Sequence, residues 1–310
     1  MKKMINSTHI SGALYQHDLA IKVSGEQSNN PGTEFISGIV EIATDDAGIN
    51  IVPVHFTYVT ATTKKGTPNN TYIVLKNIID GVHKSVMGHG ADNATKLRID
   101  SAIGLNEFYS DRNGTEELIS AKRNEGGFVH VTADVEEDEK LRNTFDCDMI
   151  ITSVSRKEAD DEKNLPEKGI VKGAIFNFRN ELMPVEFSVL VPAAIDYFED
   201  LGATSKSPVF TRVKGVQIAE SITRRVEEES AFGEPSVREY KSTRKDFVIT
   251  WAAKEPYIWD DESSITANEL KEAMAAREIS LAEMKKRSDE YKASRNGGAA
   301  AAPAAGAFNF

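Results

Sequence analysis

The sequence predicts a mainly β protein in which one small five-stranded barrel occurs twice, followed by a C-terminal helix and a tail. From Ile10 to Val226, short runs of alternating or branched apolar residues are separated by Gly, Asn and Asp, a pattern typical of strands and turns. A motif also returns with the same internal spacing, which indicates a duplication. It is Gly38-Ile39-Val40 with Pro53-Val54-His55-Phe56 in the first half, and Gly169-Ile170-Val171 with Pro184-Val185-Glu186-Phe187 in the second.

Both copies have the same predicted order of elements. The motif marks a hairpin around a polar turn, at residues 44–48 and 177–181. A helix that ends at glycine follows, over 71–80 and 192–201. One strand precedes each hairpin, at 14–23 and 149–154, and two follow each helix, at 96–103 with 128–132 and at 209–222 with 247–251, each pair separated by a long charged segment. This order, β-β-β-α-β-β, is that of an oligonucleotide-binding (OB) barrel, although other small barrels and sandwiches share it.

The composition then divides the chain into four parts. We predict one OB-like barrel over residues 1–145 and a second over 146–259. Good helix formers dominate from Thr266 to Ala293, so a helix is expected over 260–296. Residues 297–310 form a Gly/Ala/Pro tail with an aromatic tip, and such a tail is expected to be disordered because it cannot bury a core.

Composition and charge exclude several classes of protein. No apolar run approaches the roughly 20 residues of a membrane span, and the N-terminus lacks the apolar core of a secretory signal. We therefore expect a cytoplasmic protein, in the bacterial host if a phage encodes it. The net charge of -11 argues against a simple polyelectrolyte binder, so a nucleic-acid surface must be a local cluster of Lys and Arg.

Motifs of catalysis and metal binding are missing from the sequence. It contains no glycine-rich phosphate loop, nucleophile elbow or paired-carboxylate signature, and its six histidines lack the spacing of a metal site. The single cysteine, Cys147, excludes an internal disulfide and a multi-cysteine zinc site, and we expect it to be buried. The prediction is a binding protein that is not an enzyme and uses no metal or cofactor.

Binding of single strands requires aromatic faces and cations on one concave surface. The candidates in the first copy are Phe56, Tyr58, Lys64, Lys65, Arg98, Phe108, Tyr109, Arg112, Lys122 and Arg123, and those in the second are Phe178, Arg179, Arg212, Lys214, Arg224, Tyr240, Lys241, Arg244, Lys245 and Trp251. Strand alternation places Phe56 and Tyr58 on one face, so a core position is the alternative for each, and Phe128 is expected in the core. Glutamates 227–229 follow Arg224 closely, so an internal salt-bridge network is an equal alternative there.

With its repeated strand order, its Asn113-Gly114 hairpin and its tail ending in Phe310, the chain resembles single-stranded DNA-binding proteins of the bacteriophage and bacterial replication type, which have tandem OB folds. The resemblance implies sequence-independent binding and protection of single-stranded DNA in replication, recombination and repair. It also implies that Phe308 and Phe310 recruit replication and recombination proteins, although the tip lacks the family's acidic run. Homo-oligomerisation and the choice between DNA and RNA stay open. One alternative is a structural or assembly protein, such as a phage virion component, that uses its duplicated β-domains for subunit contacts. Another is an enzyme or nuclease accessory whose site is assembled from distant residues.

Overall fold

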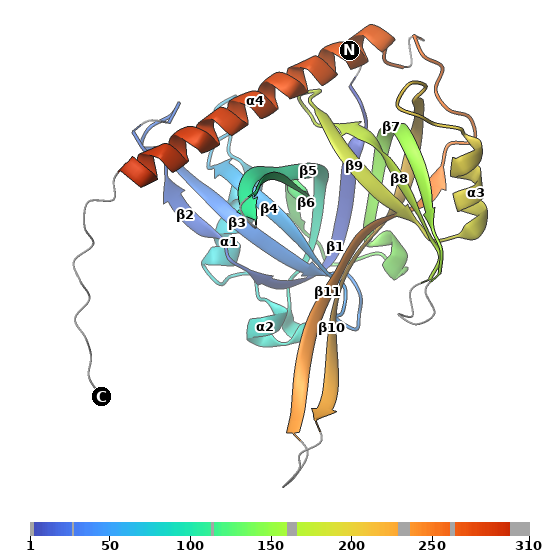
Figure 1. The fold of residues 1–310 in the computed structure, drawn as a ribbon. Coiled ribbons are helices and arrows are strands. Elements are labelled where there is room, and N and C mark those ends of the chain that lie inside the picture. The colour runs from blue at the N-terminus through green and yellow to red at the C-terminus, as the bar shows by residue number, and fades with distance from the viewer. Residues whose placement is uncertain are drawn as a thin grey trace, which may run out of the picture.

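The computed structural model describes residues 3–26, 28–112, 115–159, 166–228, 236–260 and 264–297 (Figure 1). Within them, eleven strands form one hydrogen-bonded sheet. The strands are β1 (Asn6–His17), β2 (Ala20–Val23), β3 (Glu34–Ala43), β4 (Ile51–Thr60), β5 (Lys96–Arg112), β6 (Thr115–Val131), β7 (Asn143–Lys157), β8 (Lys168–Phe176), β9 (Leu182–Val189), β10 (Val209–Glu228) and β11 (Ser236–Ala252). The helices are α1 (Asn70–Ile79), α2 (Val86–His89), α3 (Pro192–Asp200) and α4 (Ala267–Gly297), with short 3-10 turns at Ala91–Asn93 and Glu139–Leu141.

Strand pairing closes each half of the chain into a ring. In ring 1, β1 pairs with β3, β3 with β4, β4 in parallel with β6, β6 with β5, and β5 again with β1. Ring 2 repeats this circuit with β7, β8, β9, β11 and β10, and its third and fifth strands are again parallel. The predicted hairpins are therefore confirmed, and antiparallel pairing of β1 with β7 joins the two rings. The domain boundaries at 145 and 259 stay a prediction.

Each ring encloses its own hydrophobic core, and one helix contributes to each. Leu75 and Ile78 of α1 are buried among the residues of ring 1, and Ile195 and Phe198 of α3 among those of ring 2. α1 begins after Asn69, whose side chain accepts a hydrogen bond of 3.1 Å from the Thr71 amide and so satisfies a free donor of the first turn. The two predicted helices of the repeats are confirmed.

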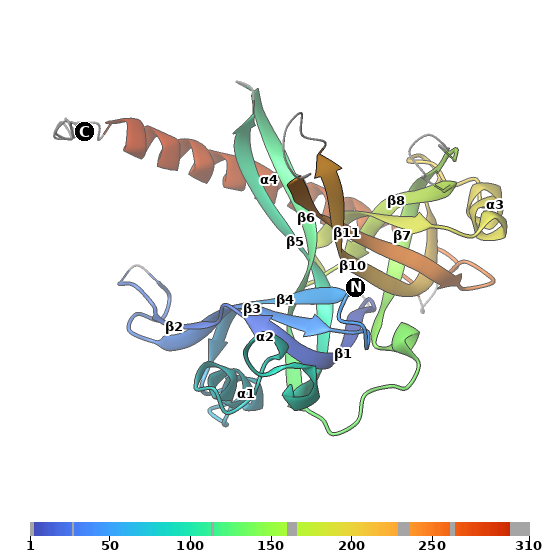
Figure 2. The same ribbon diagram turned by 90° about the horizontal axis from the view of Figure 1, so that it is seen from below.

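The two long charged segments are strands, which corrects the expectation that they separate short strands. β5 and β6 remain paired up to Arg112 and Thr115, and β10 and β11 up to Glu228 and Ser236. Asn113 and Gly114 themselves lie outside the described residues. Much of the β5–β6 extension is at least partly accessible to solvent, so it does not show the apolar alternation that marks a half-buried strand. The result is a β5–β6 arm (104–112 and 115–123) and a β10–β11 arm (217–228 and 236–247). Figure 2 shows the β5–β6 arm reaching towards α4, whereas Figure 1 shows the β10–β11 arm projecting from the end of the molecule opposite α4.

α4 spans the top of both rings in Figure 1. Its first turns pack through Leu270 and Ala273 against a small core cluster that contains Phe210. Farther along, Arg277 bonds Glu107 over 2.7 Å, and Lys285 and Lys292 pair with Glu116 of the β5–β6 arm. The predicted helix is confirmed and is attached first by apolar and then by ionic contacts. No helix in the described part of the chain combines the length and apolarity needed to cross a bilayer.

Candidate nucleic-acid interface

Three β-bulges turn aromatic side chains out of the rings. Each bulge places one extra residue in one of two paired strands. The extra residue lies between Phe56 and Val59 in β4, between Glu125 and Phe128 in β6, and between Ile249 and Trp251 in β11. An extra residue reverses the alternation of side chains between the two faces beyond it. Tyr58 is therefore 45% exposed, Phe128 70% and Trp251 48%.

Two expectations are wrong for this reason. Phe56 and Tyr58 do not share a face, because Phe56 is buried in the core of ring 1 while Tyr58 is exposed. The core alternative is therefore confirmed for Phe56, which cannot stack on a ligand. Phe128 is not a core residue, and its neighbour Val129 takes the buried position. Gly126 and Gly127 form the bulge before Phe128 with φ values of 62° and 112°, which glycine adopts readily.

The outer surface of ring 1 carries three aromatic rings that we call the aromatic platform: half-buried Phe35 and exposed Tyr58 and Phe128. The ring centroids of Phe35 and Tyr58 lie 4.5 Å apart, with the ring planes at 35°. Two hollows flank this pair. One, of about 340 Å³, is lined by residues that include Lys22, Phe35, His55 and Arg123. The other, of about 280 Å³, is lined by residues that include Tyr58, Lys64 and Phe128, and reaches the start of α1 at Thr71.

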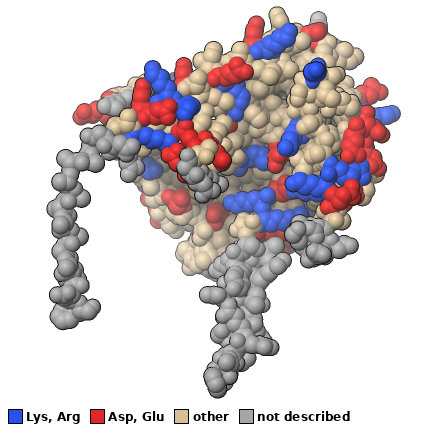
Figure 3. All heavy atoms as spheres, viewed as in Figure 1, with Lys and Arg blue, Asp and Glu red and all other residues tan. Residues whose placement is uncertain are grey.

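Cations surround the platform. Lys22, Lys64 and Lys65 are exposed and form no ion pair with an acidic residue of the described ranges. Arg123 donates to Glu125 over 2.7 Å but still lines the first hollow. Figure 3 shows Lys and Arg side chains in a broken band above the base of the β10–β11 arm, with acidic side chains beside them.

His55 lies where the two rings meet at the platform. Burial lowers the pKa of its imidazole, and the positive charges of Arg123 and, to a smaller extent, Lys245 lower it further. Lys245 belongs to β11 and Arg123 to β6, so both rings contribute cations to this region. Flat rings next to cations can stack bases and contact phosphates of a flexible strand.

Several other predicted cations are already paired. Arg98 lies 3.3 Å from Asp100, and Arg244 lies 3.9 Å from Glu220. Arg212 binds both carboxylate oxygens of Asp146 over 2.8 and 2.6 Å, which raises the pKa of its guanidinium, and Lys214 lies 3.6 Å from the same carboxylate. These pairs reduce the charge that each side chain could offer to a phosphate.

Lys122 packs between the two rings. Its ammonium donates to the backbone carbonyl of Glu186 and lies 5.3 Å from the ring centroids of both Phe187 and Phe247. Burial lowers the pKa of this ammonium. The predicted phosphate contact is therefore better described as a contact that ties ring 1 to ring 2.

The remaining candidates that the structure describes are on the β5–β6 arm and in the turn between β8 and β9. Phe108 is exposed on the β5–β6 arm, where the ring of Tyr109 lies 5.3 Å from the Lys285 ammonium of α4. Phe178, 77% exposed in the turn between β8 and β9, carries the Arg179 guanidinium 5.1 Å from its ring. The described residues do not include the side chains of Arg112, Arg224, Tyr240 and Lys241, or any part of Phe308 and Phe310.

Sequence reasoning missed four residues of this site, namely Lys22, Phe35, His55 and Phe128. Consecutive glycines inside a strand pattern indicate a bulge, so Gly126-Gly127 was the signal that could have exposed Phe128. Phe35 had no comparable signal, because the bulge that places Tyr58 beside it lies in the neighbouring strand.

Metal-binding groups and the cysteine are the other features that could carry chemistry. Among them, no three His, Cys, Asp or Glu side chains are grouped so that they could hold a metal ion. Cys147 is buried, as expected, and burial raises the pKa of its thiol.

Comparisons with known proteins give one family match. The profile of the YorF family matches residues 6–287. A search of curated proteins finds no match. Among solved structures, a deletion variant of the single-stranded DNA-binding protein from Thermus aquaticus is similar at 8% identity, over 84% of this chain and 100% of that chain, with a TM-score of 0.45. Nothing about the ligand of this chain follows from a likeness of this size.

Proposed function

The chain belongs to the YorF family, and we propose that it binds single-stranded DNA without sequence preference, through the aromatic platform of ring 1. The observation that carries this proposal is the contact between exposed Tyr58 and half-buried Phe35, with hollows on both sides that are lined by Lys22, Arg123 and Lys64. In this proposal the chain is a binding protein and not an enzyme, and it protects single strands during replication, recombination or repair.

Stacking and phosphate contact would act together in this mode of binding. Every base has a flat face, so stacking on Phe35, Tyr58 and Phe128 tolerates any sequence. Lys22, Lys64 and Lys65 would contact successive phosphates and release counterions, which makes the affinity depend on salt. A duplex hides the faces of its bases, so it would offer only phosphates to this surface.

Fluorescence anisotropy of labelled oligo-dT, titrated at two salt concentrations, tests the proposal. We expect binding that weakens with salt, by a slope of about -0.7 in log K per phosphate contacted, and much weaker binding of a duplex of equal length. Equal affinity for the duplex, or no binding, would contradict the proposal. Stable large oligomers without DNA, together with no binding, would favour an assembly protein instead.

The tail is proposed to serve other proteins. Phe308 and Phe310 would recruit replication or recombination partners, while the platform binds DNA. A chain that lacks residues 297–310 should then keep its affinity for oligo-dT. A large loss of affinity in this truncated chain would place the tail in the DNA site itself.

A further inference from the structure

Ring 2 also has an exposed aromatic side chain directly after a bulge, as ring 1 has at Phe128. In ring 1, Phe128 pairs with Asp100 directly beside the bulge of the fifth strand. In ring 2, Trp251 pairs with Lys214 directly beside the bulge of its own fifth strand. Because the two rings have the same order of pairing, Phe128 and Trp251 hold equivalent positions in the duplicated fold.

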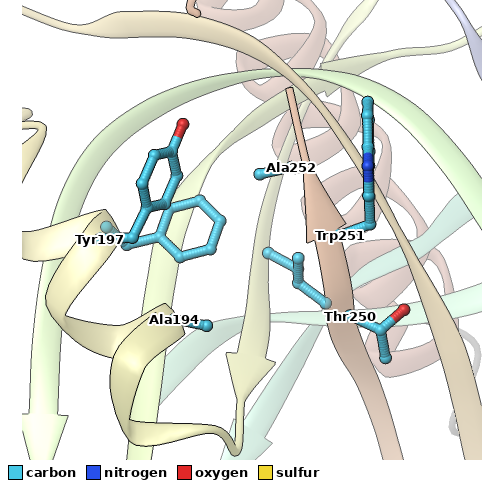
Figure 4. Close-up of a pocket in the computed structure, with 7 residues that line it drawn as sticks. Ala194, Tyr197, Thr250, Trp251 and Ala252 are labelled. Atoms are coloured by element: carbon cyan, nitrogen blue, oxygen red, sulfur yellow. The ribbon is translucent and has the colours of Figure 1, made fainter. Parts of the chain in front are cut away.

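A hollow of about 200 Å³ lies next to Trp251, between α3 and β11. Figure 4 shows Tyr197 of α3 and Trp251 of β11 on opposite sides of it, with Ala252 between them. The Tyr197 hydroxyl donates to the Ala253 carbonyl over 2.8 Å, so this ring is held in place. The corresponding hollow of ring 1 lies between the bulge at Phe128 and the start of α1, so a helix borders the hollow in both rings.

A cation lies beside the tryptophan. The ammonium of Lys214 is 5.2 Å from the centroid of the Trp251 ring. Lys214 is exposed, and its distance to Asp146 is 3.6 Å, so its charge is only partly compensated and stays accessible. An exposed indole, a fixed phenol ring and an accessible ammonium suit a flat group that is attached to an anion.

We infer that this cleft binds one unpaired nucleobase, stacked against Trp251, with the adjoining phosphate beside Lys214. The inference rests on the proposed function and extends it to a second contact point in ring 2. α1 and α3 lie at opposite ends of the molecule in Figure 1, and Arg123 and Lys245 lie where the two rings meet. A strand that leaves the platform would pass these cations before it reaches Trp251.

Tryptophan fluorescence tests the inference, because the chain has only two tryptophans. Trp259 packs against Phe210, at 5.9 Å between ring centroids, and serves as the matched control. Trp259→Phe leaves Trp251 as the single tryptophan, and oligo-dT should quench its emission. The midpoint of this quenching titration should equal the midpoint of an anisotropy titration with a labelled oligomer. Trp251→Phe should bind with an unquenched signal from Trp259.

Oligomer length provides the second readout. A short oligo-dT of about 8 nucleotides can be held by one barrel, whereas one of about 30 can reach both. Trp251→Ala should weaken binding of the long oligomer by about tenfold and leave the short one unchanged. Phe35→Ala should weaken both.

The outcomes separate the inference from the proposed function. Two results would overturn the inference and leave the proposed function of the platform unaffected. One is oligo-dT binding detected by anisotropy without quenching of Trp251, and the other is an equal loss of affinity for both oligomer lengths in Trp251→Ala. Absence of oligo-dT binding by the unaltered chain would overturn both. A thermal melt of each variant distinguishes a lost contact from a lost fold.

Discussion

The third strands of the two rings begin alike and end differently. β4 contains Pro-Val-His-Phe and β9 contains Pro-Val-Glu-Phe, and the phenylalanines, Phe56 and Phe187, are both buried. Beyond Phe56 the register of β3 with β4 shifts, whereas β8 and β9 stay in one register from Gly169 and Val189 to Phe176 and Leu182. One extra residue in β4, and not a larger number of aromatic residues, exposes Tyr58 of ring 1 beside half-buried Phe35.

The equivalent face of ring 2 has a different role. It exposes Pro184 and a weak ion pair of 3.8 Å between Lys172 and Glu186, and Lys122 of ring 1 docks on the Glu186 backbone. Nearby, Gln217 of β10 accepts from the Asn124 amide over 2.8 Å inside the junction. The face without a bulge therefore helps to hold the rings together, while the face with a bulge remains open to a ligand.

The largest effect on stability is expected from a substitution inside the bulge that precedes Phe128. A Cβ at Gly127 would lie 2.2 Å from the Asp100 carbonyl oxygen, at a φ of +112° that other residues rarely adopt. Gly127→Ala should lower the free energy of unfolding by about 2–4 kcal/mol, from strain and clash together. Urea unfolding measures this, and Gly25→Ala, with no neighbour within 4 Å of the new Cβ, is the control. Equal stability of the two variants would contradict the account of the bulge.

Removal of the platform rings should be the largest effect on binding. Phe35→Ala and Tyr58→Ala should each lower oligo-dT affinity by about 5- to 150-fold, because stacking of one base contributes about 1–3 kcal/mol. Glu186→Ala, on the equivalent strand of ring 2, should change the affinity less than twofold. Anisotropy titrations give the comparison, with Val23→Ala as a control for an exposed apolar side chain in β2. A stronger effect of Glu186→Ala than of Tyr58→Ala would reverse the assignment of the two faces.

Unpaired and paired cations should differ in salt dependence. Lys64→Ala and Lys65→Ala should each reduce the slope of log K against log salt by about 0.7 to 1. Arg212→Ala should leave the slope unchanged, because the guanidinium is already bound to Asp146. It should instead lower the melting temperature, since it removes two hydrogen bonds from that carboxylate and leaves it only the more distant Lys214. Slopes that change equally in all three variants would show that pairing does not determine which cations contact DNA.

The smallest expected effect concerns His55, whose counterpart in ring 2 is Glu186. Because burial lowers the pKa of His55 below its unfolded value near 6.5, the unfolded chain binds this proton more readily. The stability that comes from the neutral imidazole is complete above pH 6.5 and is lost as the pH falls through the folded pKa. Burial also lowers the pKa of His17 and His83, so their contributions have the same sign.

Urea unfolding between pH 7.5 and 5 measures this dependence. The free energy of unfolding should fall towards pH 5, and His55→Gln should make the decline shallower. A decline that is equally steep in His55→Gln would assign the effect to the other two histidines.

Much of the fold could be predicted from sequence, because apolar periodicity and the repeated Gly-Ile-Val and Pro-Val-X-Phe motifs specify which strands pair. The site was predicted less well, since exposure at Tyr58 and Phe128 depends on register shifts that periodicity cannot detect. Charge alone was also a poor guide. Arg98 is paired with its near neighbour Asp100. Arg212 is paired with Asp146, which is 66 residues away in the sequence and is brought close only by the fold.

Photocrosslinking locates the residues on which a bound single strand stacks. An oligo-dT that carries 5-iododeoxyuridine forms covalent adducts with aromatic side chains it stacks on, and mass spectrometry of the digested protein locates them. The bulge-exposed platform predicts adducts at Phe35, Tyr58 and Phe128, and their loss on competition with unmodified oligo-dT. Adducts confined to Phe108 or Phe178, with the three platform rings unmodified, would show that the single strand binds elsewhere.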